Sequence, residues 1–230
     1  MKSLNLWRLY DKATERHIKF LQKINGIPVC LYYSVFALDY NKETFKKDGK
    51  PYIKGYINNQ NAVHCQILVA DFDKITESEH NAIIDMFNSC DIEVLSVFSG
   101  HGYQDIILLS EKVYDLNILK KFCCILKRKG FPVDENIVDP ARVMRMPFSF
   151  NCKEFDPTNK YHSDSPKAIP TRLVRETDKR YSVKEIFEKL EMLPDSPASF
   201  NMQIENPQLG KQEEIFPKIQ PKIQPGILKQ

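Results

Sequence analysis

The sequence predicts a mixed α/β (α+β) domain built around one sheet and followed by a flexible, proline-rich tail. Apolar runs typical of strands alternate with amphipathic helical segments through the first 193 residues. The chain is 42% hydrophobic and 11% aromatic, which is enough to bury a sizeable core. After Leu193, prolines and a tandem Pro-Lys-Ile-Gln repeat indicate a linker without a core of its own. We therefore expect a folded domain over 1–193 and a tail over 194–230.

The N-terminal quarter predicts a surface helix, a strand and a long loop. Apolar residues at helical spacing among charges favour a helix over 10–25, which Gly26 would end. Residues 29–38 are β-branched and aromatic, so they predict a strand. Residues 40–62 are rich in Lys, Asn, Gly and Tyr, and favour an exposed loop or hairpin that could contact a ligand.

The middle of the chain alternates strands and helices. Residues 65–70 form a near-continuous apolar run, as expected of a strand buried on both faces. Thr76 and Glu79 form a capping box, which predicts a helix that runs to about Ser89. The remaining predicted elements are strands over 92–98 and 105–109 joined as a hairpin, a helix over 115–129, strands over 143–148 and 171–174, and a helix over 182–191 that begins at a second capping box.

Charge and hydropathy limit the function classes. The 33 basic and 30 acidic residues give a net charge of +3, which neither demands nor excludes nucleic acid. The basic outer face of the helix over 115–129 is either a solubilising surface or a contact for a phosphate backbone. Six cysteines without CxxC spacing indicate reduced thiols and disfavour a zinc site with His64. No apolar run approaches the roughly 20 residues of a membrane span, so we expect a cytoplasmic protein without membrane contact.

Two carboxylates follow the apolar run over 65–70. Asp71 and Asp73 stand at i and i+2, so on a strand they point to the same face. Such carboxylates repel each other unless a cation lies between them, and Mg²⁺ or Mn²⁺ suits oxygen ligands best. The alternative is that the first acid ends a strand and the second begins a turn.

Two further stretches carry polar groups suited to phosphate. The glycine turn over 99–104, Ser-Gly-His-Gly-Tyr-Gln, could bind phosphate through its amides, although glycine hairpin turns are common. In the stretch over 139–153, Asp139 can supply a third metal oxygen. The same stretch holds two arginines suited to bidentate phosphate contact, an amide and a lysine: Arg142, Arg145, Asn151 and Lys153. The alternative for this stretch is a surface ion-pair cluster.

Together the three stretches resemble the archaeo-eukaryotic primase (AEP) superfamily, the primase-polymerases common on plasmids, phages and other mobile elements. That pattern is an acid-x-acid strand end, a Ser-Gly-x-Gly-x-His turn, and an acid before a strand reading Arg-x-Pro-Gly-x-x-Asn-x-Lys. Order and spacing match over about residues 28–175. Two positions depart from the pattern. Gln104 replaces the histidine that contacts the nucleotide's phosphates in the family, and Phe148 replaces a glycine, which would narrow the nucleotide pocket.

The resemblance implies an RRM-like catalytic core, with a mixed or antiparallel sheet flanked by helices, and an N-terminal α/β part. It implies a DNA primase or primase-polymerase that transfers nucleotides from NTPs or dNTPs onto single-stranded DNA by a two-metal mechanism, with a replicative helicase as a candidate partner. The implied Mg²⁺ or Mn²⁺ ligands are Asp71, Asp73 and Asp139. The implied nucleotide-binding residues are Ser99, Gly100, Gly102, Gln104, Arg142, Arg145, Asn151 and Lys153. The alternative is a catalytically weak or inactive module of this fold that binds nucleic acid or nucleotide in a replication or defence complex.

Overall fold

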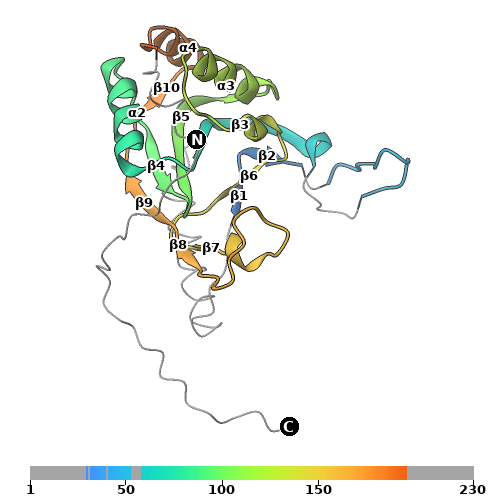
Figure 1. Cartoon of the computed structure of the whole chain (residues 1–230). Coiled ribbons are helices and arrows are strands. Elements are labelled where there is room, and N and C mark those ends of the chain that lie inside the picture. Colours follow the sequence, from blue (N-terminus) through green and yellow to red (C-terminus); the bar gives the residue numbers. More distant parts are fainter. Residues whose placement is uncertain (1–29, 31, 40, 53–57, 196–230) are drawn as a thin grey trace. The chain divides into compact units, whose positions relative to one another are not determined.

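The structure is a computed structural model that describes residues 30, 32–39, 41–52 and 58–195 (Figure 1). These residues belong to one compact unit, Pro28–Met202. The helix predicted over 10–25 and residues 196–230 of the predicted tail lie outside the described residues. The domain boundary at residue 193 therefore remains a prediction.

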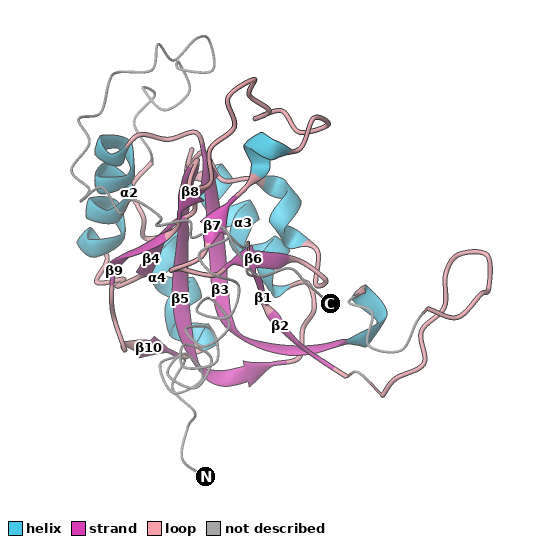
Figure 2. Cartoon of the chain, turned by 90° about the horizontal axis from the view of Figure 1, so that it is seen from below, coloured by secondary structure: helices cyan, strands magenta, loops and turns pink. Residues whose placement is uncertain are grey.

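One larger sheet organises the described residues. Its strands follow the order β2 (Phe36–Leu38), β3 (Ala62–Asp73), β5 (Gly102–Val113), β4 (Leu95–Phe98) and β9 (Arg172–Arg175), and neighbours along this path are antiparallel. Strand β10 (Arg180–Tyr181) pairs with β5 in parallel. Figure 2 shows the two long strands, β3 and β5, running side by side through the sheet. Both strands are longer than predicted, because each continues past its apolar run into polar residues that still pair.

Two small ribbons complete the strand pairing in the described residues. Strand β1 (Tyr32–Ser34) pairs with β6 (Val143–Arg145), and β7 (Phe150–Asn151) pairs with β8 (Ile169–Pro170). The single strand predicted over 29–38 is thus wrong, because β1 and β2 join different sheets. Between them, the Val35 backbone N–H donates to the Arg142 carbonyl at 3.4 Å instead of continuing the ladder.

Three α-helices lie in the described residues: α2 (Glu77–Ser89), α3 (Ile118–Arg128) and α4 (Val183–Glu191). The capping box of α2 is confirmed, since the Thr76 hydroxyl accepts from the Glu79 N–H and the Glu79 carboxylate accepts from the Thr76 N–H. At α4 only the serine half of the predicted box forms, from Ser182. Figure 1 shows α3 and α4 next to each other at one end of the sheet, and α2 beside β4.

The order β3–α2–β4–β5–α3 places the first and third strands of the series side by side. This is the βαββα part of a ferredoxin-like, RRM-type fold. The predicted α/β class with an antiparallel sheet is confirmed. Residues 68–70 and Phe72 are fully buried, so β3 has a core on both faces as expected. Short 3₁₀ turns η1 (Asn59–Asn61), η2 (Glu135–Val138) and η3 (Lys153–Phe155) lie between these elements.

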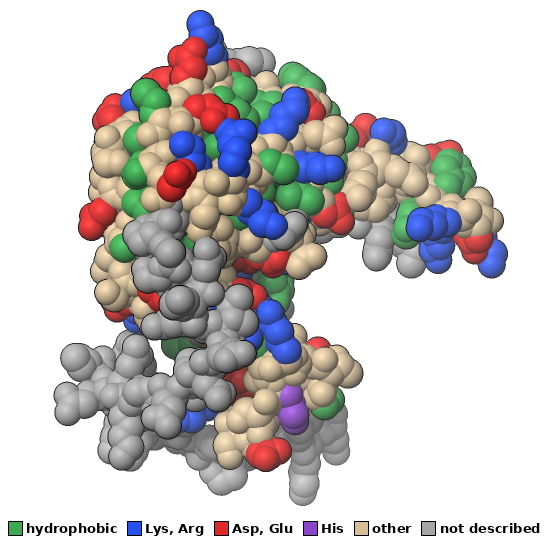
Figure 3. All heavy atoms as spheres, turned by 45° about the horizontal axis from the view of Figure 1, so that its top comes forward, with side chains coloured by type: hydrophobic (Ala, Val, Ile, Leu, Met, Phe, Trp, Pro, Cys, Tyr) green, Lys and Arg blue, Asp and Glu red, His purple; other side chains and the backbone are tan. Residues whose placement is uncertain are grey.

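The basic outer face of α3 is exposed, as predicted. Lys121 pairs with Asp115 at 2.7 Å, and Arg128 pairs with Glu191 of α4. Figure 3 turns this end of the sheet forward and shows Lys and Arg side chains interspersed with acidic ones. These pairings favour a solubilising surface over a phosphate contact. None of the helices in the described part of the chain is both long and apolar enough to cross a membrane.

Candidate active site

The acid-x-acid pair lies inside β3, directly opposite the glycine turn. Asp71 pairs with Gln104 and Asp73 pairs with Gly102 across the β3–β5 ladder, so two of the three stretches meet at one end of these two neighbouring strands. Glycine is required at 102, because a Cβ there would lie 2.0 Å from the Phe72 carbonyl oxygen. This close approach brings the turn against the acids.

Asn151 ties the third stretch to the same turn. Its amide nitrogen donates to the Ser99 carbonyl at 2.7 Å, and its oxygen accepts from the Lys153 N–H at 3.1 Å. Gly100 has φ +101° and leaves room for the Asn151 side chain, whose Cβ would lie 2.7 Å from a Cβ at that glycine. The Ser99 hydroxyl donates to the Gly102 carbonyl. The Ser99 and Asn151 side chains thus hold the turn and position Lys153.

Asp71 is the most perturbed acid of the site. Its side chain is buried, and its Oδ1 atom has no hydrogen-bond partner. Burial, together with the neighbouring charges of Asp73 and Asp134, raises the pKa of Asp71 to about 7. Lys153 and Arg142 act in the opposite direction on that pKa but do not cancel these effects. A buried carboxylate that faces two like charges favours the binding of a cation.

Asp134 is an acid that the sequence interpretation missed. Its backbone N–H donates to the Asp71 carbonyl at 2.8 Å, which fixes it beside the acid pair. Its carboxylate caps η2 and lies 3.7 Å from Arg142. By contrast, Asp139 is exposed, and its carboxylate accepts from the Ala141 N–H at 3.1 Å. The structure therefore brings Asp134 to Asp71, whereas Asp139 as third ligand is an untested prediction that its local turn contact does not favour.

The cationic residues of the third stretch lie on strand β6 and just after β7. Arg145 is buried, and its guanidinium stacks on the Tyr32 ring at 5.0 Å and donates to the Tyr32 hydroxyl. In the described ranges, no carboxylate lies within ion-pair distance of Arg145 or Lys153. Burial lowers the pKa of Lys153, and the Asp73 charge opposes this shift. A buried guanidinium without an acid partner suits an anionic ligand.

The two positions that depart from the family pattern differ in their surroundings. Gln104 is buried on β5 directly opposite Asp71, and its Oε1 atom has no hydrogen-bond partner. Phe148 is 52% exposed and has φ +60°, a conformation that a bulky side chain rarely adopts. The Phe148 N–H donates to the Thr171 carbonyl at 3.0 Å, which helps to hold that conformation. This turn also ends the strand predicted over 143–148 early, at Arg145.

The carboxylates present fit a hard divalent ion. Within the described residues, no group of three or more His, Cys, Asp or Glu side chains is arranged to hold a metal. Mg²⁺, however, is usually held by one or two carboxylates, with waters and substrate phosphates completing the shell. The Oδ1 atom of Asp71 is an oxygen donor of this kind that protein groups leave unsatisfied.

No protein-family model matches the chain, and no curated protein matches it in sequence. Among solved structures, the chain is similar to the AEP domain of the primase-polymerase (PrimPol) of cyanophage S-2L, with 11% sequence identity and a TM-score of 0.47. The match covers 75% of this chain and 76% of that chain. Values this low do not say what the present chain does, so its function has to be inferred from its own residues and their geometry.

Proposed function

We propose that this chain is a nucleotidyltransferase of the primase-polymerase type, which joins nucleoside triphosphates on single-stranded DNA with Mg²⁺ or Mn²⁺. The observation that carries the proposal is the buried, unsatisfied carboxylate of Asp71, which lies beside Asp73 and opposite the glycine turn. The resemblance of the three stretches to the AEP superfamily supplies the reaction class. Arg145 and Lys153 support it, because they bring positive charge to the same site and form no ion pair with a carboxylate of the described residues.

The transfer requires little covalent chemistry from the protein. The oxygen of a 3′-hydroxyl attacks the α-phosphorus, a P–O bond forms, and the bond from the α-phosphorus to the oxygen bridging the β-phosphate breaks. Pyrophosphate leaves with that electron pair, and the hydroxyl proton passes to solvent. Bound divalent ions would lower the pKa of the hydroxyl and neutralise the phosphate charge. Positioning and charge neutralisation carry such reactions.

Different residues of the chain would bind the metal ions, bind the triphosphate and position the glycine turn. Asp71 and Asp73 would hold the ions, and we propose Asp134 in place of Asp139 as the third acid. Arg145 and Lys153 would bind the triphosphate, and the Gln104 amide can donate a hydrogen bond but brings no charge. Ser99 and Asn151 act by positioning the turn, through the contacts described above. Arg142 would act through Asp134, with which it pairs.

The experiment is primer synthesis on single-stranded DNA with labelled NTPs or dNTPs and either Mg²⁺ or Mn²⁺. We expect the wild-type chain to make or extend a strand, and Asp71→Ala with Asp73→Ala to make none. Asp91→Asn is the matched control, because Asp91 is an exposed acid away from the site. It precedes β4, whereas the glycine turn of the site follows the opposite end of that strand. This control should retain synthesis.

An inactive wild type would overturn the proposed enzyme. If that inactive chain still binds single-stranded DNA or nucleotide, the alternative of a non-catalytic binding module takes its place. Gln104 favours this alternative, because the charge that a histidine would bring to the phosphates is missing.

A further inference from the structure

A lysine outside the three stretches forms an ion pair with one acid of the pair, Asp73. The Nζ atom of Lys160 lies 3.3 Å from the Oδ2 atom of Asp73, 87 residues away in the sequence. The Lys160 side chain is 60% exposed and that of Asp73 is 24% exposed. An ion pair that is this accessible to water is weak and exchanges readily.

The lysine belongs to a cluster of cations around one aromatic ring. The Tyr161 ring has Lys153 at 4.8 Å, Lys160 at 5.1 Å and Lys74 at 5.9 Å from its centroid. Its other neighbour is His101 of the glycine turn, stacked at 4.2 Å with 11° between the planes. The ring therefore fixes three ammonium groups, by cation–π attraction, at the site where the proposed triphosphate would lie. We call this set of residues, Lys74, Lys153, Lys160 and Tyr161, the lysine cluster.

The charge at the acids affects where the ammonium groups of the lysine cluster lie. Burial raises the pKa of the Tyr161 hydroxyl, and the charges of Asp73, Asp71 and Asp134 act in the same direction. The ring lies near the acids because Lys160, which contacts it, also pairs with Asp73. A divalent ion at these acids would repel the nearby ammonium of Lys160 and compete with it for Asp73. An anionic triphosphate would attract the same ammonium. Binding of the ion and of the nucleotide would thus shift Lys160 in the same direction, away from Asp73.

We propose that Lys160 is an exchangeable counterion, which pairs with Asp73 in the metal-free protein and transfers to the triphosphate when a divalent ion binds. This inference rests on the proposed function and assigns Lys160 and Tyr161 to nucleotide binding. The Tyr161 ring keeps the lysine close during the exchange, because its contact with Lys160 does not depend on the Asp73 pair.

Two binding measurements test the exchange without relying on synthesis. The first is the affinity for Mn²⁺ alone, from electron paramagnetic resonance or calorimetry. The second is the affinity for a non-hydrolysable fluorescent dNTP analogue at saturating Mn²⁺. We expect Lys160→Met to bind Mn²⁺ about threefold more tightly and the nucleotide about threefold more weakly. Lys160→Arg should restore nucleotide binding.

The opposite signs exclude a merely structural role, which would weaken both affinities. Lys167→Met is the matched control, because Lys167 is an exposed lysine of the same loop whose N–H bonds to Glu154, and both affinities should stay at the wild-type values. Tyr161→Leu should weaken nucleotide binding with little change in Mn²⁺ affinity.

If Lys160→Met changes neither affinity, or weakens both, the exchange is wrong while the proposed function stands. If the wild-type chain binds Mn²⁺ no better than Asp71→Ala does, the proposed function fails and the exchange fails with it. Thermal unfolding of each variant checks that it is folded, and we expect no loss for the changes at the exposed Lys160 and Lys167.

Discussion

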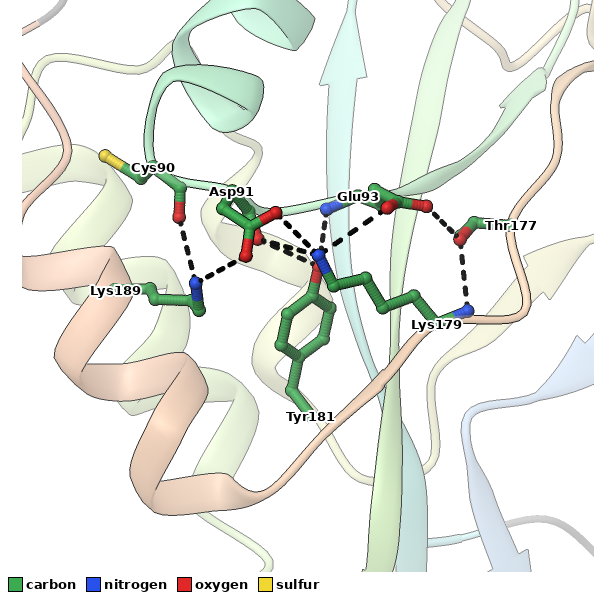
Figure 4. Close-up of polar contacts among 7 residues, drawn as sticks. All are labelled: Cys90, Asp91, Glu93, Thr177, Lys179, Tyr181 and Lys189. Atoms are coloured by element: carbon green, nitrogen blue, oxygen red, sulfur yellow. Dashed lines mark hydrogen bonds and ion pairs between the residues drawn. The ribbon is translucent and has the colours of Figure 1, made fainter.

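Two polar clusters lie at opposite ends of β4, and they differ in whether their polar groups have hydrogen-bond partners. The first is the acid site at Asp71 and Asp73. The second, shown in Figure 4, joins the segment before β4 to β10 and α4; we call it the Asp91 cluster. It contains Asp91, Glu93, Thr177, Lys179, Tyr181 and Lys189. In the Asp91 cluster the carboxylates have lysine or hydroxyl partners, whereas at the acid site the Oδ1 atom of Asp71 has no hydrogen-bond partner.

Every contact of the Asp91 cluster joins opposite charges or a donor to an acceptor. Lys179 and Lys189 lie 2.7 Å and 3.0 Å from the Asp91 carboxylate. The buried Tyr181 hydroxyl accepts from the Glu93 N–H at 2.7 Å and donates to the Asp91 carbonyl at 3.1 Å. These bonds connect residues about 90 positions apart, so they fix the C-terminal strand and helix to the sheet. Their role is fully explained by folding.

Folding alone does not explain the acid site. Asp71 is buried beside two like charges with an unsatisfied oxygen, and Gln104 has another. Buried polar groups are normally satisfied, and clusters of perturbed acids gather at functional sites. The comparison teaches that unsatisfied buried polar atoms, more than the density of charge, distinguish a candidate binding site from a structural clamp in this chain.

The largest expected effect concerns which acid completes the site. Asp134→Asn should lower primer synthesis at least about tenfold, since it removes a carboxylate beside Asp71 and weakens the hold on Arg142. Asp139→Asn should leave synthesis within about twofold, because its carboxylate serves a local turn. Rates at fixed Mn²⁺ and template concentrations measure both. The reverse ranking would restore Asp139 as the third ligand.

The second effect is a pH dependence that has opposite signs in the two clusters. Burial and like charges raise the folded pKa of Asp71 to about 7 from the model-compound value of 3.8. Its contribution to stability is therefore complete below about pH 4 and is lost as pH rises through 7. In EDTA, the free energy of unfolding should fall by on the order of 2 kcal/mol between pH 5 and pH 8 through this group. Asp71→Asn should remove that fall.

The Asp91 carboxylate behaves in the opposite way. Hydrogen bonds from Lys179 and Lys189 lower its pKa, so its stabilising contribution is present above pH 3.8 and is lost as pH falls through the lowered value. Asp91→Asn should therefore reduce the melting temperature at pH 7 and have less effect at pH 3. A melting-temperature series over pH separates the two carboxylates, and equal pH profiles in Asp71→Asn and wild type would contradict the assignment.

A smaller effect is expected on the free energy of unfolding when one tyrosine hydroxyl is removed from either region. Tyr181→Phe leaves the Glu93 N–H without its partner and should cost about 1 kcal/mol of unfolding free energy while primer synthesis is unchanged. The Tyr161 hydroxyl has no partner in hydrogen-bonding geometry, and burial, followed by the nearby Asp73 charge, raises its pKa. Tyr161→Phe should therefore leave stability almost unchanged. Urea denaturation of both variants gives the difference, and equal losses would show that Tyr161 is also a structural contact.

Local signals in the sequence predicted most of the fold. The capping box at Thr76, the helical spacing through α3 and the glycine turn after β4 each depend on neighbouring residues, and the structure confirms them. The break at Val35 could not be predicted from local signals, because β1 pairs with β6, more than 100 residues away, and β2 pairs with β3, more than 20 residues away.

The acid pair and the glycine turn of the site followed from their spacing. Asp134 and Lys160 did not, since one is held by a backbone bond to Asp71 and the other lies in a polar loop without periodicity. The position of Asp134, directly after the apolar Phe131–Val133 segment, was the available signal for this acid. The family pattern of an acid shortly before an arginine-containing strand favoured Asp139 instead.

The smallest expected effect concerns two residues with a positive φ, one in the stretch over 139–153 and one in the Asp91 cluster. Phe148 has φ +60° and Asp91 has φ +54°. Aspartate tolerates this region, whereas for phenylalanine it costs about 1–2 kcal/mol. Glycine would relieve that strain but lose about 0.5–1 kcal/mol of chain entropy on folding. Phe148→Gly should therefore stabilise the protein by about 0.5 kcal/mol, whereas Asp91→Gly should destabilise it, because two lysines lose their partner. Calorimetric melting of both variants measures the signs, and a destabilised Phe148→Gly would mean that the half-exposed ring contributes packing energy that exceeds its strain.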